Sequence, residues 1–182
     1  SYGYYTDGTY LTRVLPQYLY TGTELDEMRS VYNSGLSAIL SYAKTASTPV
    51  GRMLRANDYI CANYEYDTNY EIYSPELMFK HKRGVCQAYM LIYRAVLNEL
   101  GISNVAVLSD EMNHTWNMVE LGGEWYHVDV TWNDPVSDVP LRVYHNNFLL
   151  SDTGITNEGH YSWYSSEALP TASDTTYDDY FW

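Results

Sequence analysis

The sequence predicts an α+β fold in which helices come first and a mostly antiparallel sheet follows. Three observations lead to this expectation. Apolar residues recur every three to four positions over 24–43 and 86–100, as on the buried stripe of a helix. After residue 104, short apolar runs take over, with the β-branched and aromatic side chains that strands favour. Two adjacent glycines, Gly122 and Gly123, separate two of these runs and are typical of a two-residue hairpin turn.

The length of 182 residues suits one domain that can bury a sizeable core. We expect a single domain over 1–182, with its core at about 24–163 and a flanking segment at each end. Residues 1–23 are rich in Tyr, Thr and Gly and show no period, so we expect an extended lead-in there.

The first helix is expected to begin at Glu24, because Thr23 can cap it and acidic residues suit the positive end of the helix dipole. A second helix is expected from Pro49 to about Tyr64. The buried stripe of the first helix consists of Leu25, Met28, Tyr32, Leu36, Ile39 and Ala43.

The third and fourth helices follow a loop. Residues 63–73 are polar and aromatic without a helical period and predict that loop. Pro75 opens a short helical turn, since Pro is favoured at the first helical position, and Gly84 is expected to end it. Residues 86–100 carry the widest apolar face of the sequence and predict a helix that stops at Gly101.

Strands are expected in the second half of the chain. The tail from Asp152 is rich in turn-forming residues, and its end, 177–182, indicates no particular structure. The expected strands cover 105–108, 114–121, 124–131 and 144–150.

Composition and charge bear on partners. The net charge of −13 repels phosphates, so we expect no nucleic-acid partner. No apolar run approaches the roughly 20 residues that a membrane helix needs, so we expect no membrane insertion. The 21 tyrosines either form a binding surface or fill half-buried strand positions. Low Lys content and high Tyr, Asn, Ser and Thr content favour an extracellular or cell-surface protein.

Cys86 is the candidate nucleophile. It follows Gly84 and Val85 where the strongest helix is expected to begin, and the free N–H groups of a helix start stabilise a thiolate. The same N–H groups can hold an oxyanion when the thiolate attacks a carbonyl. The alternative is an inert cysteine on a helix face, which is the reading that Cys61 fits. We expect both cysteines to be free of a disulfide.

The expected hairpin predicts which side chains share one face of the sheet. With a two-residue turn, Trp116 faces Asp129 and His114 faces Thr131, so all four point to the same side. His114 and Asp129 are then diagonal neighbours, roughly 7–8 Å apart at the backbone. A carboxylate on one imidazole nitrogen leaves the other nitrogen free to take a thiol proton. A three-residue turn would instead place Asp129 on the opposite face.

Asp129 should have a partner, because its apolar sequence neighbours make an unpaired charge costly. His114 is the preferred candidate. His127 shares the same face and is a competing base, but it pairs with Met118, deeper in the hairpin.

Little in the sequence suggests a metal or a cofactor. The five histidines include no pair at the short spacing of a zinc helix motif, so we expect no metal site. Asp174, Asp178 and Asp179 either bind calcium weakly or belong to a solvated tail. The sequence has no glycine-rich phosphate loop, and we expect no cofactor.

Three motifs, in this order and at these spacings, resemble the transglutaminase-like domain of bacterial proteins. The resemblance covers about residues 50–163, including 57–60 with 66–67 upstream, Leu100-Gly101-Ile102 between the first two motifs, and 144–152 with His160 downstream. The motifs are Gly84-Val85-Cys86-Gln87-Ala88-Tyr89, His114-Thr115-Trp116-Asn117, and Trp125-Tyr126-His127-Val128-Asp129-Val130-Thr131-Trp132-Asn133-Asp134.

The resemblance implies a papain-like, transglutaminase-like α+β core, in which a cysteine at a helix N-terminus packs against a sheet that carries His and Asp. It implies a catalytic triad of Cys86, His114 and Asp129. Ala88 stands where many relatives carry glycine. Alanine is also small and favours a helix, so this departure leaves the triad in place.

The resemblance also implies an oxyanion hole that pairs the N–H group of the nucleophile with a side chain upstream of it. Tyr66 and Tyr64 are the two candidates, and the sequence does not choose between them. Gln87 in the first motif and Trp116 in the second are further candidates for substrate contact.

The implied chemistry is a thioester formed on a protein or peptide substrate, and three activities stay open. The first is a cysteine hydrolase or protease, which we favour. The second is a transglutaminase that joins a glutamine side chain to an amine, which differs only in whether amine or water reaches the thioester. The third is a non-catalytic interaction domain on the same fold, against which an intact triad argues.

Overall fold

The protein is described by a computed structural model that covers residues 2–6, 8–16, 19–134, 136–137, 139 and 142–181, with only the backbone for 2–6 and 11–16. The helices are α1 (Gly22–Ala43), α2 (Pro49–Asn63), α3 (Pro75–His81), α4 (Cys86–Glu99) and α5 (Asp152–Asn157). The strands are β1 (Tyr2–Thr6), β2 (Leu11–Pro16), β3 (Glu65–Tyr66), β4 (Arg83–Gly84), β5 (Asn104–Ser109), β6 (His114–Leu121), β7 (Glu124–Val128) and β8 (Phe148–Leu150).

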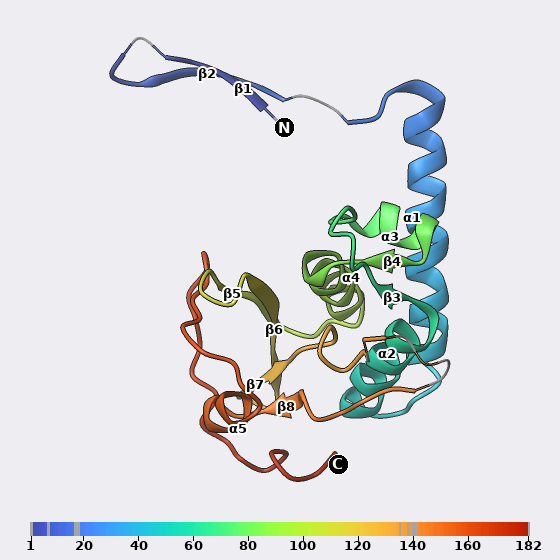
Figure 1. Cartoon of the computed structure of the whole chain (residues 1–182), viewed down its shortest axis with the longest axis vertical. Helices are drawn as coiled ribbons and strands as arrows, with labels where there is room; N and C mark the ends of the chain where they lie inside the picture. Colours follow the sequence, from blue (N-terminus) through green and yellow to red (C-terminus); the bar gives the residue numbers. More distant parts are fainter. Residues whose placement is uncertain are drawn as a thin grey trace.

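The core of the fold is a helical layer packed on an antiparallel sheet, as the sequence predicted. Strands β5, β6, β7 and β8 form the sheet in that order, and every neighbouring pair is antiparallel. Helix α4 packs against β5 and β6, while α1, α2 and α3 surround α4 (Figure 1). The C-terminal segment with α5 lies at the other side of the sheet (Figure 1). Within the described residues, no helix is both long enough and apolar enough to cross a membrane.

The sheet has an apolar cluster on each face. Alternation along β6 sends Val119 into the cluster shared with the helices, and Trp116 and Met118 into the cluster shared with the C-terminal segment. On β7, Tyr126 and Val128 belong to the helix side. The side chains at odd positions of β7 therefore face the C-terminal segment, which determines where the functional groups can lie.

Helices α2 and α4 occupy the predicted positions to within one residue. Helix α1 begins at Gly22, with Thr21 as N-cap, rather than at Glu24 after Thr23. Helix α3 ends before Gly84, because Lys82 adopts the left-handed conformation at φ 62° and closes the helix. Gly84 instead lies where α3 and α4 approach each other. A Cβ there would come within 2.6 Å of the Met78 sulfur, so only glycine fits at this position.

The expected extended lead-in over 1–23 contains two paired strands, and its last two residues belong to helix α1. Strands β1 and β2 pair with each other in an antiparallel hairpin, seen at the top of Figure 1. The abundant Tyr and Thr residues suit strands, but their lack of strict alternation hid the pairing. Residues 1, 7, 17 and 18 of that prediction lie outside the described part of the chain.

The hairpin between β6 and β7 has the predicted turn and register. Gly122 and Gly123 have φ values of 65° and 93°, which only glycine adopts without strain. Leu121 faces Glu124, and the register continues without a shift to the pair of Asn117 and Val128. The three-residue alternative is therefore wrong.

The last two strands are shorter than predicted. β7 ends at Val128 instead of 131, and β8 covers only Phe148–Leu150 instead of 144–150. The residues after Val128 leave the sheet because a loop over 129–134 follows, in which backbone hydrogen bonds run back to Asp129 and Thr131.

The tail from Asp152 holds more structure than turns. It begins with α5, whose N-cap Ser151 accepts a hydrogen bond from Gly154 N–H. Asp178 then receives Ser151 N–H and Oγ–H, both at 2.7 Å, which ties the end of the chain to the sheet. Asp174 accepts from the N–H of Thr176 at 2.7 Å. Asp174 and Asp178 therefore accept hydrogen bonds within the protein and do not simply belong to a solvated tail.

Asp67 organises the loop that precedes Cys86. Its buried carboxylate accepts N–H bonds from Asn69, Glu71 and Ile72 at 2.9–3.2 Å and lies 3.4 Å from the Arg83 guanidinium. Burial alone would raise the pKa of Asp67, but these donors and the arginine outweigh it and lower the pKa.

We predict that Asp67→Asn lowers the free energy of unfolding by about 1–3 kcal/mol at pH 7, because buried N–H groups lose a charged acceptor. A lowered pKa gives stability that is present above the unfolded-state value near 4 and is lost as pH falls through the folded-state value. The difference between variant and wild type should therefore shrink in acid. Urea unfolding at pH 7 and pH 3 measures it. Glu65→Gln, an exposed neighbour, is the matched control and should change little. An equal loss at both pH values would contradict the role of the charge.

Candidate active site

Cys86 is the first residue of α4 and is half-buried. Its N-cap, Val85, has no capping side chain, and Val85 N–H donates to Ile72 O at 2.8 Å, which fixes the approach to the helix. Within the described chain, the N–H groups of Cys86 and Gln87 have no hydrogen-bond acceptor, as is usual for the first turn of a helix. Two free donors therefore lie beside the thiol, where an oxyanion would form.

Tyr66 is brought next to Cys86 by a short parallel pairing. β3 and β4 align Tyr66 with Gly84, two residues before the cysteine. Burial and the charge of the Cys86 thiolate raise the pKa of Tyr66 to about 12. The phenol therefore keeps its proton at neutral pH and can act as a hydrogen-bond donor at the site.

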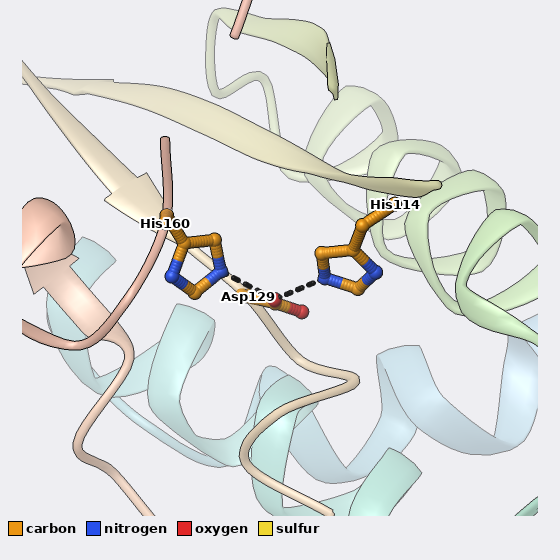
Figure 2. Close-up of side chains that lie close together, drawn as sticks. All are labelled: His114, Asp129 and His160. Carbon is orange, nitrogen blue, oxygen red and sulfur yellow. Dashed lines mark hydrogen bonds and ion pairs between the residues drawn. The ribbon is translucent and has the colours of Figure 1, made fainter. Parts of the chain in front are cut away.

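His114 and Asp129 are in direct contact, as the hairpin register predicted. His114 Nε2 lies 2.5 Å from Asp129 Oδ2 (Figure 2). The other carboxylate oxygen, Oδ1, accepts the N–H groups of Thr131 and Trp132 at 2.9 and 3.2 Å. Asp129 is fully buried, so these partners replace the water that the charge has lost.

His114 and Cys86 line one cavity of about 480 Å³, and Cys86 is among the groups that raise the pKa of His114. Since Nε2 is used by Asp129, Nδ1 is the nitrogen available to the thiol. Burial lowers the pKa of His114, but the Asp129 charge, its hydrogen bond and Cys86 outweigh burial and raise the pKa to about 10. At neutral pH the ring is therefore an imidazolium beside the sulfur.

Asp129 has a second histidine partner that the sequence did not assign to the site. His160 Nε2 lies 2.9 Å from the same Oδ2 atom, from the side opposite His114 (Figure 2). Its signal in the sequence was weak, because it follows α5 without a strand or helix period of its own. Only its place in the downstream part of the family resemblance pointed to it.

His127, the competing base, is bonded to other partners. Its Nδ1 accepts Trp116 Nε1–H at 2.9 Å, and its Nε2 lies 2.9 Å from Asp152 Oδ1. The ring is fully buried, and burial lowers its pKa despite Asp152. Both nitrogens are occupied, so His127 is not placed to accept a proton from Cys86.

Of the four candidates for oxyanion or substrate contact, Tyr66 and Gln87 lie at the cavity and two do not. Tyr64 is buried in the helical core, with its ring 5.8 Å from that of Phe79, because its chain position ends α2 on that side. Trp116 is also buried and stacks against the His114 ring at 5.7 Å. Trp116 therefore packs against the His114 ring and is not placed to contact a substrate.

Trp132 is a site residue that the sequence did not single out. Its ring lies 5.5 Å from the His114 ring and 4.1 Å from the His160 ring, measured between centroids. It is 39% exposed and lines the cavities on both sides of His114. A signal existed, since an exposed tryptophan three residues after the orienting aspartate suits a substrate wall.

Two cavities adjoin at the site and share Tyr66, His114 and Trp132. The cavity that includes Cys86, of about 480 Å³, is also lined by Tyr70 and Tyr73. The other cavity has about 510 Å³. The residues that complete its wall are Thr131, Asp134, Val136, Ser137, Arg142 and Tyr144.

The loop that carries Asp129 is anchored to the helices by buried polar groups. Asn133 Nδ2 donates to Asn57 Oδ1 on α2 at 3.0 Å, and Asn133 Oδ1 accepts from Asn147 N–H at 3.0 Å. The Tyr89 hydroxyl of α4 donates to Asp134. Helix α4 therefore positions both the nucleophile and the loop of the carboxylate.

His114, Asp129 and His160 are also the described residues that come close enough to hold a metal ion, with ligand atoms within 4.8 Å of one another. Both Nε2 atoms point at one carboxylate oxygen, at 2.5 and 2.9 Å, which are hydrogen-bond distances. The ligand atoms of a tetrahedral zinc site stand roughly 3.3 Å apart, so an ion would have to spread the three groups. The geometry is that of two N–H donors on one acceptor.

Cys61 has the properties of a structural cysteine. It is buried in α2, and its thiol donates to Val130 O at 3.4 Å. Burial, followed by Asp134, Asp58 and Asp129, raises the pKa of this thiol well above its usual value. Both cysteines are free, as predicted.

Comparison with curated proteins finds relatives over part of their length. Kyphoscoliosis peptidase of Mus musculus is 23% identical over 153 residues, which cover 70% of this chain and 23% of that protein. The Homo sapiens protein of the same name gives the same identity and coverage. The chain therefore spans about a quarter of the length of these relatives.

Two solved structures are similar to this chain at low sequence identity. The crystal structure of a TGase superimposes with a TM-score of 0.50 and 15% identity, over 62% of this chain and 34% of that one. A structure from Cytophaga hutchinsonii, provisionally assigned as a cysteine protease, gives a TM-score of 0.47 and 18% identity, over 62% and 42% of the two chains.

A family profile settles the classification. The profile of the transglutaminase-like superfamily matches residues 38–130, just over half of the chain. The matched range contains Cys86, His114 and Asp129. The chain belongs to the transglutaminase-like superfamily.

Proposed function

We propose that this chain is a cysteine hydrolase that cuts peptide or amide bonds through a thioester, with Cys86 as nucleophile, His114 as acid and base, and Asp129 as the group that orients His114. The observation that carries the proposal is the series formed by Cys86, the His114 ring that lines the same cavity, and the buried Asp129 carboxylate 2.5 Å from that ring. Such a series is the recurring arrangement for an activated nucleophile.

In the acylation step the Cys86 thiolate attacks the substrate carbonyl carbon and a C–S bond forms. The carbonyl oxygen becomes an oxyanion, which the free N–H groups at the start of α4 and the Tyr66 hydroxyl are placed to stabilise. The His114 imidazolium then gives its Nδ1 proton to the leaving nitrogen as the C–N bond breaks. A thioester and a free amine result.

In the deacylation step the neutral His114 takes a proton from water, and the water oxygen attacks the thioester carbonyl. The C–S bond breaks, the sulfur leaves as a thiolate, and the acid product departs. Asp129 keeps its negative charge throughout and stabilises the imidazolium, because it accepts hydrogen bonds at both oxygens.

The cavities on both sides of His114 support a peptide substrate, since an extended chain can cross the site with a residue in each cavity. The word peptidase in the name of the curated relatives points the same way. Tyr66 and Trp132, common to both cavities, would contact the substrate at the bond that is cut.

Transglutamination is the second candidate. The 510 Å³ cavity opens beside His114 from the side away from Tyr70 and Tyr73, so a primary amine could reach the thioester from there. The chemistry up to the thioester is the same, and only the acceptor differs.

Alkylation by iodoacetamide tests the poised nucleophile. We predict that Cys86 reacts faster than Cys61 at pH 7, because an imidazolium faces Cys86 while Cys61 is buried and protonated. Asp129→Asn removes the charge that raises the pKa of His114, so alkylation at pH 6 should slow roughly 10-fold or more, as each pKa unit is a tenfold change in protonation. Mass spectrometry identifies the modified residue. Equal rates for the two cysteines in the folded protein would overturn the proposal.

Cys86→Ala should abolish turnover. The midpoint of thermal unfolding should stay unchanged, because the half-buried thiol contributes little to the packing of the core. The matched control, Cys61→Ala, removes the other thiol and should keep turnover. Activity is followed on a peptide library, with and without a fluorescent primary amine. Release of new carboxyl ends indicates hydrolysis, and incorporation of the amine indicates transglutamination. Turnover that survives Cys86→Ala would exclude both candidates.

A further inference from the structure

His160 lies at the back of the site, where the chain turns after α5. Its N–H donates to Ile155 O at 3.1 Å, and Gly159, with φ 101°, permits the reversal that sends the ring inward. The side chain is fully buried. The ring approaches Asp129 from the side opposite His114 (Figure 2).

The surroundings of His160 indicate which nitrogen carries its proton. A carboxylate only accepts hydrogen bonds, so Nε2, at 2.9 Å from Asp129 Oδ2, is the protonated nitrogen. Nδ1 is buried and has no hydrogen-bond partner among the described residues. The Trp132 and Trp116 rings lie 4.1 and 4.8 Å away, between centroids. His160 therefore donates to Asp129 through Nε2, and its buried Nδ1 has no acceptor among the described residues.

The two histidines on Asp129 are therefore not equivalent. His114 has Cys86 at its second nitrogen and lines the cavities, so it can exchange a proton with the thiol and the substrate. His160 has neither a partner nor a cavity at its second nitrogen, as far as the described residues extend. His114 is therefore placed to transfer a proton, whereas His160 is placed only to donate a hydrogen bond to Asp129.

We propose that His160 is a positioning residue that holds the Asp129 carboxylate in place and anionic, and that this is what keeps the proton on His114. The inference rests on the proposed function. With His114 and His160 on Oδ2, and the N–H groups of Thr131 and Trp132 on Oδ1, four donors occupy the carboxylate. A carboxylate held in this way can neither rotate away nor readily take the proton of His114.

Other titratable groups near His160 do not provide this function. His127 is one of them, but burial is the main cause of its lowered pKa, and its two ring nitrogens contact Trp116 and Asp152. Asp152 already pairs with His127. Asp129 is therefore the acceptor on which His160 acts.

Two substitutions separate the donor from the ring. His160→Phe keeps an aromatic ring between the tryptophans but removes the N–H group. His160→Gln changes the packing but keeps an amide N–H that can reach Asp129. If His160 positions the carboxylate, Cys86 should be alkylated roughly 10-fold more slowly at pH 6 in the Phe variant, which loses a hydrogen bond to a charged acceptor. The Gln variant keeps a donor and should stay within roughly threefold of wild type.

The second measurement is the NMR titration of the His114 ring in each variant. The pKa of His114 should fall in His160→Phe and be retained in His160→Gln. Both readouts unchanged in the Phe variant, or the Gln variant as impaired as the Phe variant, would show that the ring only fills space and would overturn the inference. If the Phe variant does not fold, the Gln variant alone decides the question. A fall in the pKa of His114 in the Gln variant would contradict a donor role for residue 160.

The NMR titration also separates this inference from the proposed function. A wild-type Cys86 that alkylates no faster than Cys61, together with a His114 shift that depends on residue 160, would remove the enzymatic proposal and keep the positioning role. If wild-type Cys86 is reactive, but neither its alkylation rate nor the His114 titration changes in His160→Phe, the enzymatic proposal stands and the positioning role of His160 is removed.

Discussion

The site depends on one buried charge, the carboxylate of Asp129. A charge without water is tolerated only where hydrogen-bond donors replace the solvent. Here two imidazoles and two backbone N–H groups do so. Removing any of these donors would leave part of the charge uncompensated. The two oxygens of Asp129 therefore constrain the sheet, the loop after β7 and the segment after α5.

The same carboxylate connects the two halves of the fold. β7 delivers Asp129 to the face of the sheet away from the helical core, and β6 delivers His114 to the same face. Helix α4 brings Cys86 to the edge where His114 begins β6, and it also holds the loop after Asp129 through Tyr89. The rigid elements therefore place the thiol, the imidazole and the carboxylate, and little is left to flexible loops.

Much of the helical layer and the central hairpin could be predicted, because their signals are local. The apolar period of 86–100, the proline at the start of α2, and the two glycines of the turn each specify the geometry within a few residues. The turn sets the register that pairs Asn117 with Val128, so that His114 and Asp129 come close just beyond the end of this pairing. The ends of β7 and β8, the start of α1 and the pairing of β1 with β2 were missed, since strand ends depend on partners distant in the sequence.

The distant partners of the site were beyond sequence reasoning for the same reason. His160 joins Asp129 across 31 positions of sequence, and Trp132 covers both histidines only after the loop has folded. Tyr64 and Trp116 are residue types that suit a binding site. Packing places Tyr64 in the helical core and buries Trp116 against His114. The sequence by itself determined the family, the core arrangement of helices followed by an antiparallel sheet, and the pairing of His114 with Asp129, because motif spacing and hairpin register are properties of short segments. Only the tertiary structure decided which tyrosine stands at the thiol and which second histidine supports the carboxylate, because those contacts arise where separate segments are packed together.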